Sequence, residues 1–359
     1  MTKNHNYYLN LAYNLAEQNL GKTGLNPSVG SIIVKNGTVI SSGITSINGR
    51  PHSEFNALNK LENFSGATLY TTLEPCTHYG KTPPCVDIIL KKKIKNVIYG
   101  CEDPDIRTFK KAKKFLLSKG VKASLKISKR HKNFYRSYFI NKKLKLPFIS
   151  AKIAVSNDFF SINKKKSQRW ITNSLSRRIV HLLRSKYDCV LSTSKSINLD
   201  NSLLNCRIKG LNNFKPDLFI IDLNLKLKKD LSLNKLISKR KTFIVTKNKN
   251  KKKISLYKKI GYRIITINSL KNKKDFNILY KKILKLGYSR VMIEAGLIFL
   301  KMLIRNKLIN NLYLFKSGNK LKNKGKNNIS ANFLKEINFK HIKINLDNDK
   351  LLKKEFKNV

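Results

Sequence analysis

The segment TLEPCTHYGKTPPC (residues 72–85) contains two cysteines, Cys76 and Cys85, which each follow a proline and are separated by eight residues. A β-rich run, ATLYTTL (67–73), leads into it, and His52-Ser53-Glu54 lies upstream. One imidazole and two thiolates supply the three protein ligands of a catalytic zinc site and leave a fourth position open. We therefore predict that His52, Cys76 and Cys85 bind Zn²⁺.

Glu54 is the predicted catalytic residue of this site. A bound zinc ion lowers the pKa of water to about 7, so that hydroxide is available at neutral pH. Glu54 is two residues past His52, at the start of an expected helix, and can carry protons from the attacking water to a departing nitrogen. Two other interpretations stay open: a closed structural zinc site with His78 as the fourth ligand, and a coincidence of buried cysteines.

The sequence around this segment alternates between helical and extended patterns. We expect helices over residues 5–20, after His52, over 86–93 and over 107–119, and strands at 67–73 and 96–100. Asn36-Gly37 separates the β-rich runs SIIVKNG and TVISSG and predicts a hairpin. Strands interleaved with helices predict an α/β sandwich that is covered on both faces.

A second domain is expected to begin near residue 146. A lysine-rich stretch (122–146) ends there, and LPFISAKIAV opens a new β-type run, so we divide the chain into domains 1–145 and 146–359. The runs YDCVLST, PDLFIID, KTFIVT, YRIITI and SRVMIEA predict further strands, separated by helical or polar stretches. The second domain is thus also α/β. The lysine-rich run 247–253 is expected to be an exposed loop.

Composition limits the classes of function. The 75 basic and 20 acidic residues give a net charge of +55, but only 13 of the basic residues are Arg and Lys is spread through almost every segment. We therefore expect a solvated surface that steers an anionic substrate, and no specific nucleic-acid partner. The sequence contains no apolar run of membrane-spanning length and no signal-peptide pattern, and its five cysteines do not suggest a disulfide framework. A cytoplasmic protein without membrane contact is expected.

The zinc motif resembles that of cytidine-deaminase-like enzymes, which share Asn-Pro-x-Val-Gly (here 26–30), His-x-Glu and Pro-Cys elements. The eight-residue cysteine spacing is similar to the riboflavin-pathway deaminase within that family. The resemblance implies hydrolytic deamination of 2,5-diamino-6-(5-phosphoribosylamino)pyrimidin-4-one. It implies zinc ligation by the three predicted ligands, proton transfer by Glu54, and contacts from Asn26 and His78 to the pyrimidine. Residues 105–109 depart from the family pattern, which usually has Pro and Gly there.

The second half resembles the riboflavin-specific reductase, whose fold is similar to dihydrofolate reductase. This resemblance implies NADPH as cofactor, and the sequence lacks the G-x-G-x-x-G pattern of a Rossmann domain. The matching cofactor-binding positions are Ala154, Trp170, Ser196, Asp200 and Gly296. The matching substrate-binding positions are Lys152, Gln168, Arg184, Leu204, Arg207 and Glu294. Arg184 and Arg207 suit a phosphate because guanidinium groups donate bidentate hydrogen bonds. Phe159 and Ala295 stand where the family has glycine.

Together the two motif sets resemble the bifunctional enzymes of riboflavin biosynthesis. The resemblance implies that the deaminated product, 5-amino-6-(5-phosphoribosylamino)uracil, is then reduced by NADPH, which converts its ribosyl group to ribityl. A homo-oligomer is expected. Two alternatives stay open: a nucleic-acid (tRNA) deaminase with an accessory domain, which the charge favours and the cysteine spacing opposes, and a degenerate pyrimidine-binding protein.

Overall fold

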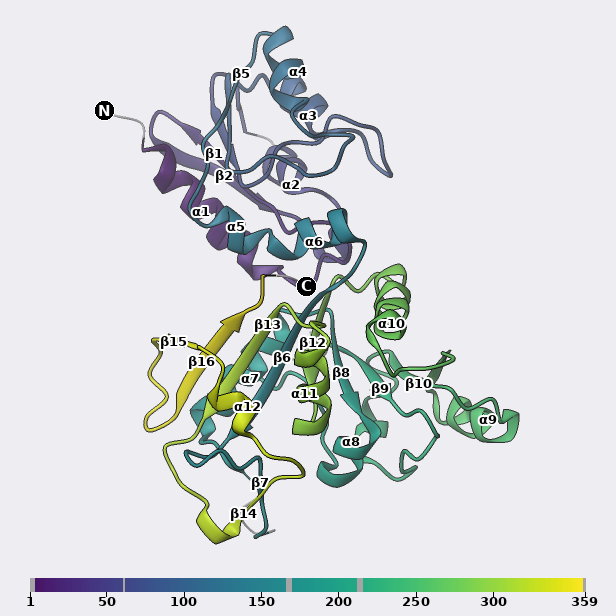
Figure 1. The fold of residues 1–359 in the computed structure, drawn as a ribbon. Helices are drawn as coiled ribbons and strands as arrows, with labels where there is room; N and C mark the ends of the chain where they lie inside the picture. The colour runs from purple at the N-terminus through teal and green to yellow at the C-terminus, as the bar shows by residue number, and fades with distance from the viewer. Residues whose placement is uncertain (1–3, 61, 166–169, 212–215, 358–359) are drawn as a thin grey trace. The chain divides into compact units, whose positions relative to one another are not determined.

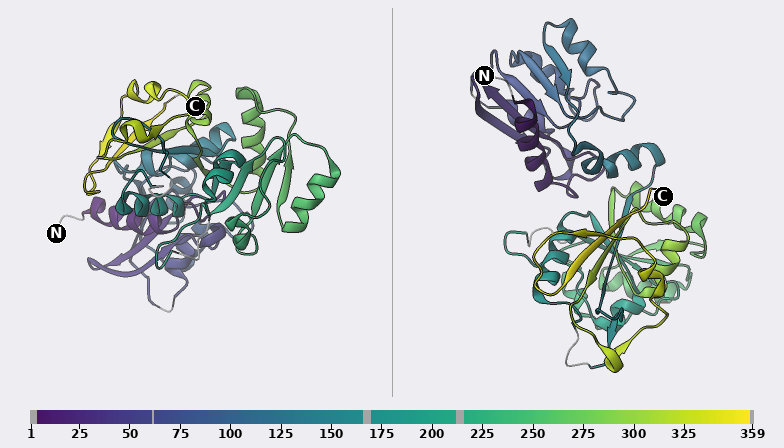
Figure 2. Two further views of the ribbon diagram at one scale, coloured as in Figure 1. Left: turned by 90° about the horizontal axis from the view of Figure 1, so that it is seen from below. Right: turned by 60° about the vertical axis from the view of Figure 1, so that its left-hand side comes forward.

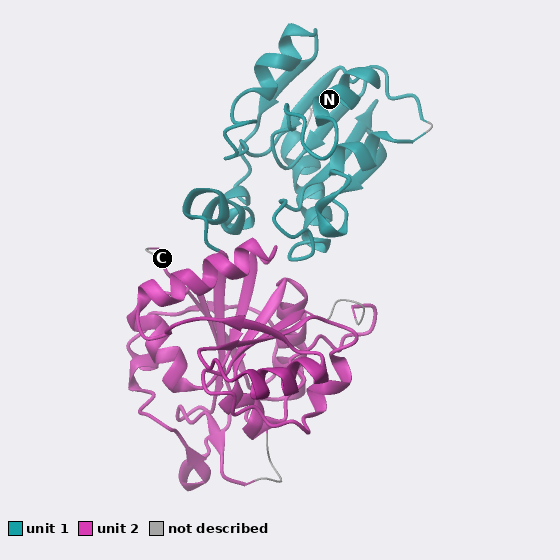
Figure 3. Ribbon diagram, turned by 90° about the vertical axis from the view of Figure 1, so that its right-hand side faces the viewer, with its two compact units in different colours: residues 1–146 teal, residues 147–359 magenta. Residues whose placement is uncertain are grey.

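The fold is known from a computed structural model that describes residues 4–60, 62–165, 170–211 and 216–357. Gln168, a predicted substrate residue, lies outside this described part. The chain divides into two compact units, residues 1–146 (unit 1) and 147–359 (unit 2), which Figure 3 colours separately. None of the helices in the described ranges has the length and apolar character needed to cross a membrane.

Unit 1 is built on a five-stranded sheet of order β2-β1-β3-β4-β5 (Figure 1). Its strands are β1 (Gly30–Lys35), β2 (Thr38–Ile44), β3 (Thr68–Thr71), β4 (Asn96–Tyr99) and β5 (Lys122–Leu125). β1 pairs antiparallel with β2 and β3, and β3, β4 and β5 are parallel. The turn between β1 and β2 has positive φ at Asn36 (51°) and Gly37 (80°). The predicted hairpin is therefore confirmed.

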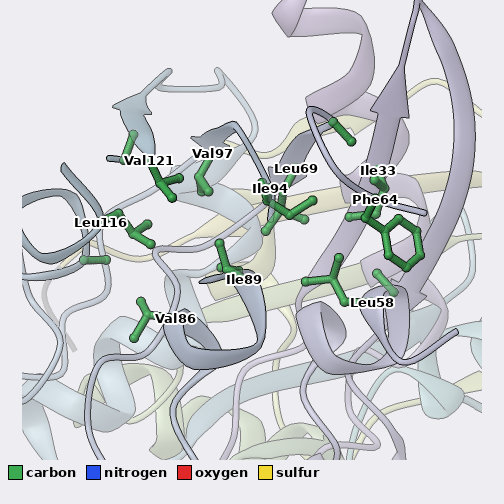
Figure 4. Close-up of a cluster of buried hydrophobic side chains, with 14 residues drawn as sticks. Ile33, Leu58, Phe64, Leu69, Val86, Ile89, Ile94, Val97, Leu116 and Val121 are labelled. Atoms are coloured by element: carbon green, nitrogen blue, oxygen red, sulfur yellow. The ribbon is translucent and has the colours of Figure 1, made fainter. Parts of the chain in front are cut away.

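Helices cover both faces of this sheet. They are α1 (His5–Gln18), α2 (Ser53–Leu58), α3 (Cys85–Lys91), α4 (Ala112–Ser118), α5 (His131–Phe134) and α6 (Arg136–Leu144), with a 3-10 helix η1 (Ile47–Gly49). Ile32 of β1 packs toward α1, whereas its neighbour Ile33 packs into the cluster formed with α2, α3 and α4 (Figure 4). Successive strand residues point to opposite faces, so both faces are buried and the predicted sandwich is confirmed.

The helix predicted over 107–119 begins only at Ala112. Residues before it form turns, because Asp105 accepts hydrogen bonds from the backbone and side chain of Arg107 and Glu74 accepts three backbone N–H groups from the segment 103–112. These side chains compete with the helical backbone hydrogen bonds. The predicted start was therefore wrong by more than one turn.

Unit 2 contains a nine-stranded mixed sheet of order β11-β10-β9-β8-β12-β6-β13-β16-β15. The first seven strands in this order, from β11 at one edge to β13, are parallel to one another. β16 pairs antiparallel with β13, and β15 pairs antiparallel with β16. The strands are β6 (Phe148–Val155), β8 (Cys189–Thr193), β9 (Asp217–Ile221), β10 (Thr242–Thr246), β11 (Arg263–Thr266), β12 (Arg290–Glu294), β13 (Asn311–Lys316), β15 (Lys340–Ile342) and β16 (Lys350–Glu355). The strands predicted from sequence are confirmed; β13, β15 and β16 were not predicted.

Helices lie on both faces of this second sheet (Figures 1 and 2). α7, α8 and α9 connect strands that progress toward β11, and α10 and α11 connect strands in the return direction, so right-handed crossovers place the two groups on opposite faces. The helices are α7 (Ser174–Ser185), α8 (Ser194–Asp200), α9 (Lys251–Ile260), α10 (Lys273–Lys285), α11 (Leu297–Arg305) and α12 (Asn332–Lys335). Short elements are β7 (Ile162–Asn163), β14 (Gly325–Lys326), η3 (Ser232–Leu236) and η4 (Lys322–Lys324).

The lysine-rich run 247–253 is a loop only as far as residue 250. Lys251, Lys252 and Lys253 form the first turn of α9 and are exposed, and the Asn250 side chain accepts from the Lys253 N–H at 3.0 Å. Lys is a good helix former and Asn is a strong N-cap, and here these two preferences outweigh the repulsion among like charges. The prediction of a loop was wrong for residues 251–253.

The packing of α2 on the β1–β2 hairpin depends on Gly43. A Cβ at this position would lie 2.8 Å from the carbonyl carbon of Asn56, and closer still to the Ser53 oxygen and the Ala57 nitrogen. These are backbone atoms of α2 and cannot rotate away. Glycine at position 43 therefore sets how closely α2 approaches the sheet.

We expect Gly43→Ala to lower the free energy of unfolding of unit 1 by about 1–3 kcal/mol, because the added methyl group must push α2 outward. Urea unfolding followed by far-UV circular dichroism measures this loss. Gly80→Ala is the matched control, because its Cβ would meet only the Arg50 side chain, at 3.4 Å. Equal unfolding curves for the two variants would contradict the prediction.

Candidate functional site

The structure brings the three predicted metal ligands of unit 1 together. His52 is the N-cap residue of α2, Cys76 follows β3, and Cys85 is the first residue of α3. His52 Nδ1 lies 3.3 Å from Cys85 Sγ and 3.6 Å from Cys76 Sγ, and the ligand atoms all lie within 4.8 Å of one another. Ligands about 2.0–2.3 Å from one tetrahedral zinc ion lie roughly 3–4 Å apart, so the donor set fits zinc.

The cluster has three members among the described residues, and His78 is not one of them. His78 Nδ1 instead lies 3.1 Å from Thr108 Oγ1. Burial and the Arg107 charge lower the pKa of His78, which favours a neutral imidazole at pH 7. Three ligands are the arrangement of a catalytic site with an open position, whereas a closed structural site has four.

The electrostatics of the cluster favour a thiolate at Cys76. Hydrogen bonds from the Cys85 thiol and the His52 ring outweigh burial and lower the pKa of Cys76 to about 4. The thiolate is the metal-binding form of cysteine. The Cys85 thiol has a raised pKa, because it is hydrogen-bonded to Cys76 and is buried. A bound metal ion would displace the thiol proton of Cys85.

Glu54 lies beside the cluster in the first turn of α2. Glu54 is 4% exposed, and burial raises the pKa of its carboxyl group, although the nearby His52 partly opposes this increase. Ser53 Oγ donates to Glu54 Oε2 at 2.9 Å, and a hydrogen bond links the Glu54 carboxyl group to the Cys85 thiol. A raised pKa suits a group that must both accept and release a proton near neutral pH.

Two further features surround the metal centre. The Asn26 side chain donates to the Gly49 carbonyl oxygen at 2.9 Å, which ties the 26–30 segment to the residues that precede His52. Glu74 accepts the backbone N–H groups of Asp103, Lys110 and Ala112 at 3.0–3.2 Å and so shapes the 105–110 segment that departs from the family pattern. The position of Glu74 between β3 and Cys76 was the available signal, but sequence reasoning did not assign it this role.

In unit 2 the predicted residues Lys152, Arg184 and Glu294 form a charged group, in which Arg184 and Glu294 are buried and Lys152 is half-buried. Arg184 Nε and Nη2 donate to the two Glu294 oxygens at 2.6 and 3.0 Å, and Lys152 Nζ lies 3.8 Å from Glu294 Oε2. Burial alone would raise the pKa of Glu294, but Arg184 and Lys152 outweigh it and lower the pKa to about 2. Burial lowers the pKa of Lys152, and the negative charge of Glu294 opposes this decrease most strongly, with a smaller contribution from Asp200.

The two predicted phosphate ligands differ in their surroundings. Arg184 is 8% exposed, and its remaining nitrogen, Nη1, donates to the Asn205 carbonyl oxygen at 2.9 Å. Arg207 is exposed, and its Nη1 donates to Asn205 Oδ1 at 3.1 Å. Leu204 is buried with a positive φ of 49° and shapes the same loop. Arg184 is thus held by partners within the chain on all three nitrogens, whereas Arg207 faces solvent.

The predicted cofactor positions are distributed over several elements. Ala154 lies in β6, and Ser196 and Asp200 lie in the first and last turns of α8, where the Thr193 hydroxyl accepts from the Ser196 N–H at 3.2 Å. Gly296 is the N-cap residue of α11, and a Cβ there would meet nothing within 4 Å. Trp170 is 58% exposed, with the Arg177 guanidinium 5.0 Å from its ring centre.

The replaced glycines have different consequences. Phe159 adopts a positive φ of 64°, with the ammonium groups of Lys316 and Lys335 at 4.8 and 5.6 Å from its ring centre. A bulky residue rarely adopts this backbone conformation, so the chain keeps there a turn that glycine would form without strain. Ala295 directly precedes the α11 N-cap and is not among the residues with positive φ.

Family models match both units. Residues 2–101 match the cytidine and deoxycytidylate deaminase zinc-binding region, and residues 147–317 match the RibD C-terminal domain. The riboflavin biosynthesis protein RibD of Aquifex aeolicus is 32% identical over 80% of each chain, and that of Buchnera aphidicola is 30% identical over 86% of each. A solved structure of Acinetobacter baumannii RibD has a TM-score of 0.83 at 25% identity, over 97% of this chain and 98% of that one.

We expect Cys85→Ser to reduce bound zinc from about one ion per chain to a small fraction of that, because a neutral hydroxyl replaces one of three ligands. Metal analysis of the purified protein after dialysis measures the change. Cys101→Ser is the matched control: Cys101 is also a buried free thiol, but its sulfur donates to the Glu102 carbonyl outside the cluster. Stoichiometric zinc in the Cys85 variant would refute the ligand assignment.

Proposed function

We propose, because this chain belongs to the RibD family of bifunctional riboflavin biosynthesis proteins, that its deaminase and reductase activities act in sequence on one phosphoribosylaminopyrimidine. Unit 1 deaminates 2,5-diamino-6-(5-phosphoribosylamino)pyrimidin-4-one. Unit 2 then reduces the ribosyl group of the resulting uracil to ribityl with NADPH. The observation that carries the first step is the three-ligand cluster with the buried Glu54 beside it.

In unit 1, His52, Cys76 and Cys85 would hold the zinc ion, and Glu54 would move the protons. Zinc bound there would supply Lewis acidity and lower the pKa of a water molecule to about 7. Glu54 would accept a proton from the attacking water and deliver it to the amino group of the ring, which leaves as ammonia. Asn26 and His78 are proposed to contact the pyrimidine, and the lowered pKa of His78 supports a neutral ring that can donate and accept hydrogen bonds.

In unit 2, NADPH would supply the hydride, and the protein orients the two reactants. Arg207 is proposed to bind the substrate phosphate, supported by its exposed guanidinium. Lys152, Leu204 and Glu294 are proposed to contact the rest of the substrate, with Arg184 holding Glu294 in place. The proposed NADPH positions are Ala154, Trp170, Ser196, Asp200 and Gly296. Gly296 supports a phosphate contact because it begins a helix and carries no side chain.

The partners of the enzyme are proposed to be small anionic substrates. The net charge of +55 supports steering of a phosphorylated pyrimidine toward the protein, and specific nucleic-acid binding is not part of this proposal. The structure places none of the five cysteines in a disulfide bond. A cytoplasmic location and a homo-oligomeric assembly stay predictions.

We expect Glu54→Gln to retain zinc and lose deamination by roughly 10²–10⁴-fold in kcat, the usual contribution of general acid–base catalysis. Ammonia release from the diaminopyrimidine substrate measures the rate, and metal analysis confirms that the ligands are intact. Glu62→Gln, at an exposed position of unit 1, is the control and should behave like the unaltered enzyme. Near-normal turnover of the Glu54 variant would place the proton shuttle elsewhere.

We expect Arg207→Ala to raise the KM of the reductase for its phosphorylated substrate by roughly 10- to 100-fold, the scale of a lost charge-assisted hydrogen bond. NADPH oxidation with the phosphorylated substrate and with its dephosphorylated analogue measures the effect, and the analogue should be much less sensitive. Arg178→Ala, an exposed arginine of α7, is the control. Equal losses with both substrates would mean that Arg207 does not bind the phosphate.

A further inference from the structure

A chain of buried hydroxyl groups leads from the sheet of unit 1 to Glu54. Ser31 Oγ of β1 lies 2.8 Å from Ser53 Oγ, and Ser53 Oγ donates to Glu54 Oε2 at 2.9 Å. Ser31 and Ser53 have no solvent exposure, and Glu54 is 4% exposed. The cysteine and histidine ligands take no part in these two hydrogen bonds. The two bonds are therefore separate from the metal-ligand set.

The direction of the hydrogen bonds follows from the number of protons. Ser53 Oγ donates to Glu54 Oε2, so the single hydroxyl proton of Ser53 is used in that hydrogen bond. The Ser53 oxygen can then accept the proton of Ser31, which makes Ser31 the donor of the first bond. The chain therefore ends on one oxygen of Glu54 and leaves the other oxygen, Oε1, outside it.

Backbone packing fixes the length of this chain. Ser31 is part of a central strand with neighbours on both sides, and Ser53 is the first residue of α2. The close approach of α2 to the sheet at Gly43 brings the two hydroxyl groups within hydrogen-bond distance. The anchor of Glu54 is thus tied to the strands and does not depend on a flexible side chain.

We propose that Ser53, supported by Ser31, is a positioning residue that fixes Oε2 of Glu54 so that Oε1 is presented to the metal centre. The His-x-Glu motif leaves the residue between its two functional members unspecified, so the hydroxyl at position 53 is a feature of this chain. A carboxylate on a two-carbon side chain has several rotamers, and a charge-assisted hydrogen bond selects one of them. The inference rests on the proton-shuttle role proposed above for Glu54.

The neighbouring strand provides a matched control. Thr71 of β3 pairs directly with Ser31, so their side chains share one face of the sheet. Thr71 is fully buried, and its hydroxyl oxygen has no hydrogen-bond partner among the described residues. Thr71→Val therefore removes a buried hydroxyl group beside the chain without removing a hydrogen bond to Glu54.

The test compares Ser53→Ala, Thr71→Val and Glu54→Gln in the full-length enzyme. We expect Ser53→Ala to keep full zinc content and reductase activity, and to lower the deaminase kcat roughly 10- to 100-fold with KM changed less than about twofold, because misplacement of a catalytic group acts on the chemical step. Thr71→Val should keep kcat within about twofold of the unaltered enzyme. Glu54→Gln is the reference for complete loss of the shuttle.

A double-mutant cycle separates positioning from simple stabilisation. In the Glu54→Gln background, adding Ser53→Ala should lower kcat by less than about twofold, because the carboxylate that Ser53 orients is gone. Ser31→Ala should lower the deaminase kcat less than Ser53→Ala does, because Ser53 still donates its proton to Glu54. Adding Ser31→Ala to Ser53→Ala should not lower kcat further.

The outcomes are distinguishable. Normal kcat in Ser53→Ala with an impaired Glu54→Gln overturns the positioning role and leaves the proposed function intact. Loss of zinc, or a kcat lowered as much by Thr71→Val as by Ser53→Ala, also overturns it, because either result indicates a general packing defect. Near-normal kcat in Glu54→Gln overturns both the positioning role and the proposed shuttle.

Discussion

The close contact between α2 and the β1–β2 hairpin at Gly43 is the constraint on which the metal centre depends. α2 carries the acid–base candidate Glu54 and is capped by the ligand His52, whereas Cys76 follows the C-terminal end of β3 and Cys85 begins α3. The ligand set therefore forms only if α2 is seated at a fixed depth on the sheet. Backbone atoms set this depth, so a side-chain adjustment cannot restore it once it changes.

Each unit has a buried glutamate in its candidate site, and the two environments shift the pKa of these groups in opposite directions. Burial raises the pKa of Glu54, which is hydrogen-bonded to a neutral hydroxyl group, whereas Arg184 and Lys152 lower the pKa of Glu294 to about 2 despite its burial. The first group is suited to exchange protons and the second to remain a fixed negative charge. The same residue type thus supports two kinds of chemistry, and neighbouring charges decide which.

The sequence predicts those features that depend on particular residue types at short spacing. The cluster of His52, Cys76 and Cys85 could be predicted because metal ligation demands particular residue types near one another in the fold. The catalytic role of Glu54, which lies beside this cluster, stays a proposal. The strands of the parallel sheet could be found because they are continuous apolar runs. Other features depend on contacts that no local pattern encodes. Three such contacts join residues far apart in the chain. They are the hydrogen bonds of Glu74 to the residues before α4, the pairing of β13 with β16, and the ion pair between Arg184 and Glu294.

The lysine-rich start of α9 has a consequence for how the protein responds to ions. Its first turn places three ammonium groups at the positive end of the helix macrodipole, and the Asn250 side chain caps this end of the helix. Mobile anions that gather near such a terminus relieve this repulsion. The molecule as a whole carries 75 cationic and 20 acidic side chains, so repulsion between like charges opposes its compact state. Moderate ionic strength should therefore make the native state of this enzyme more compact and stable, in contrast to proteins that depend on surface salt bridges.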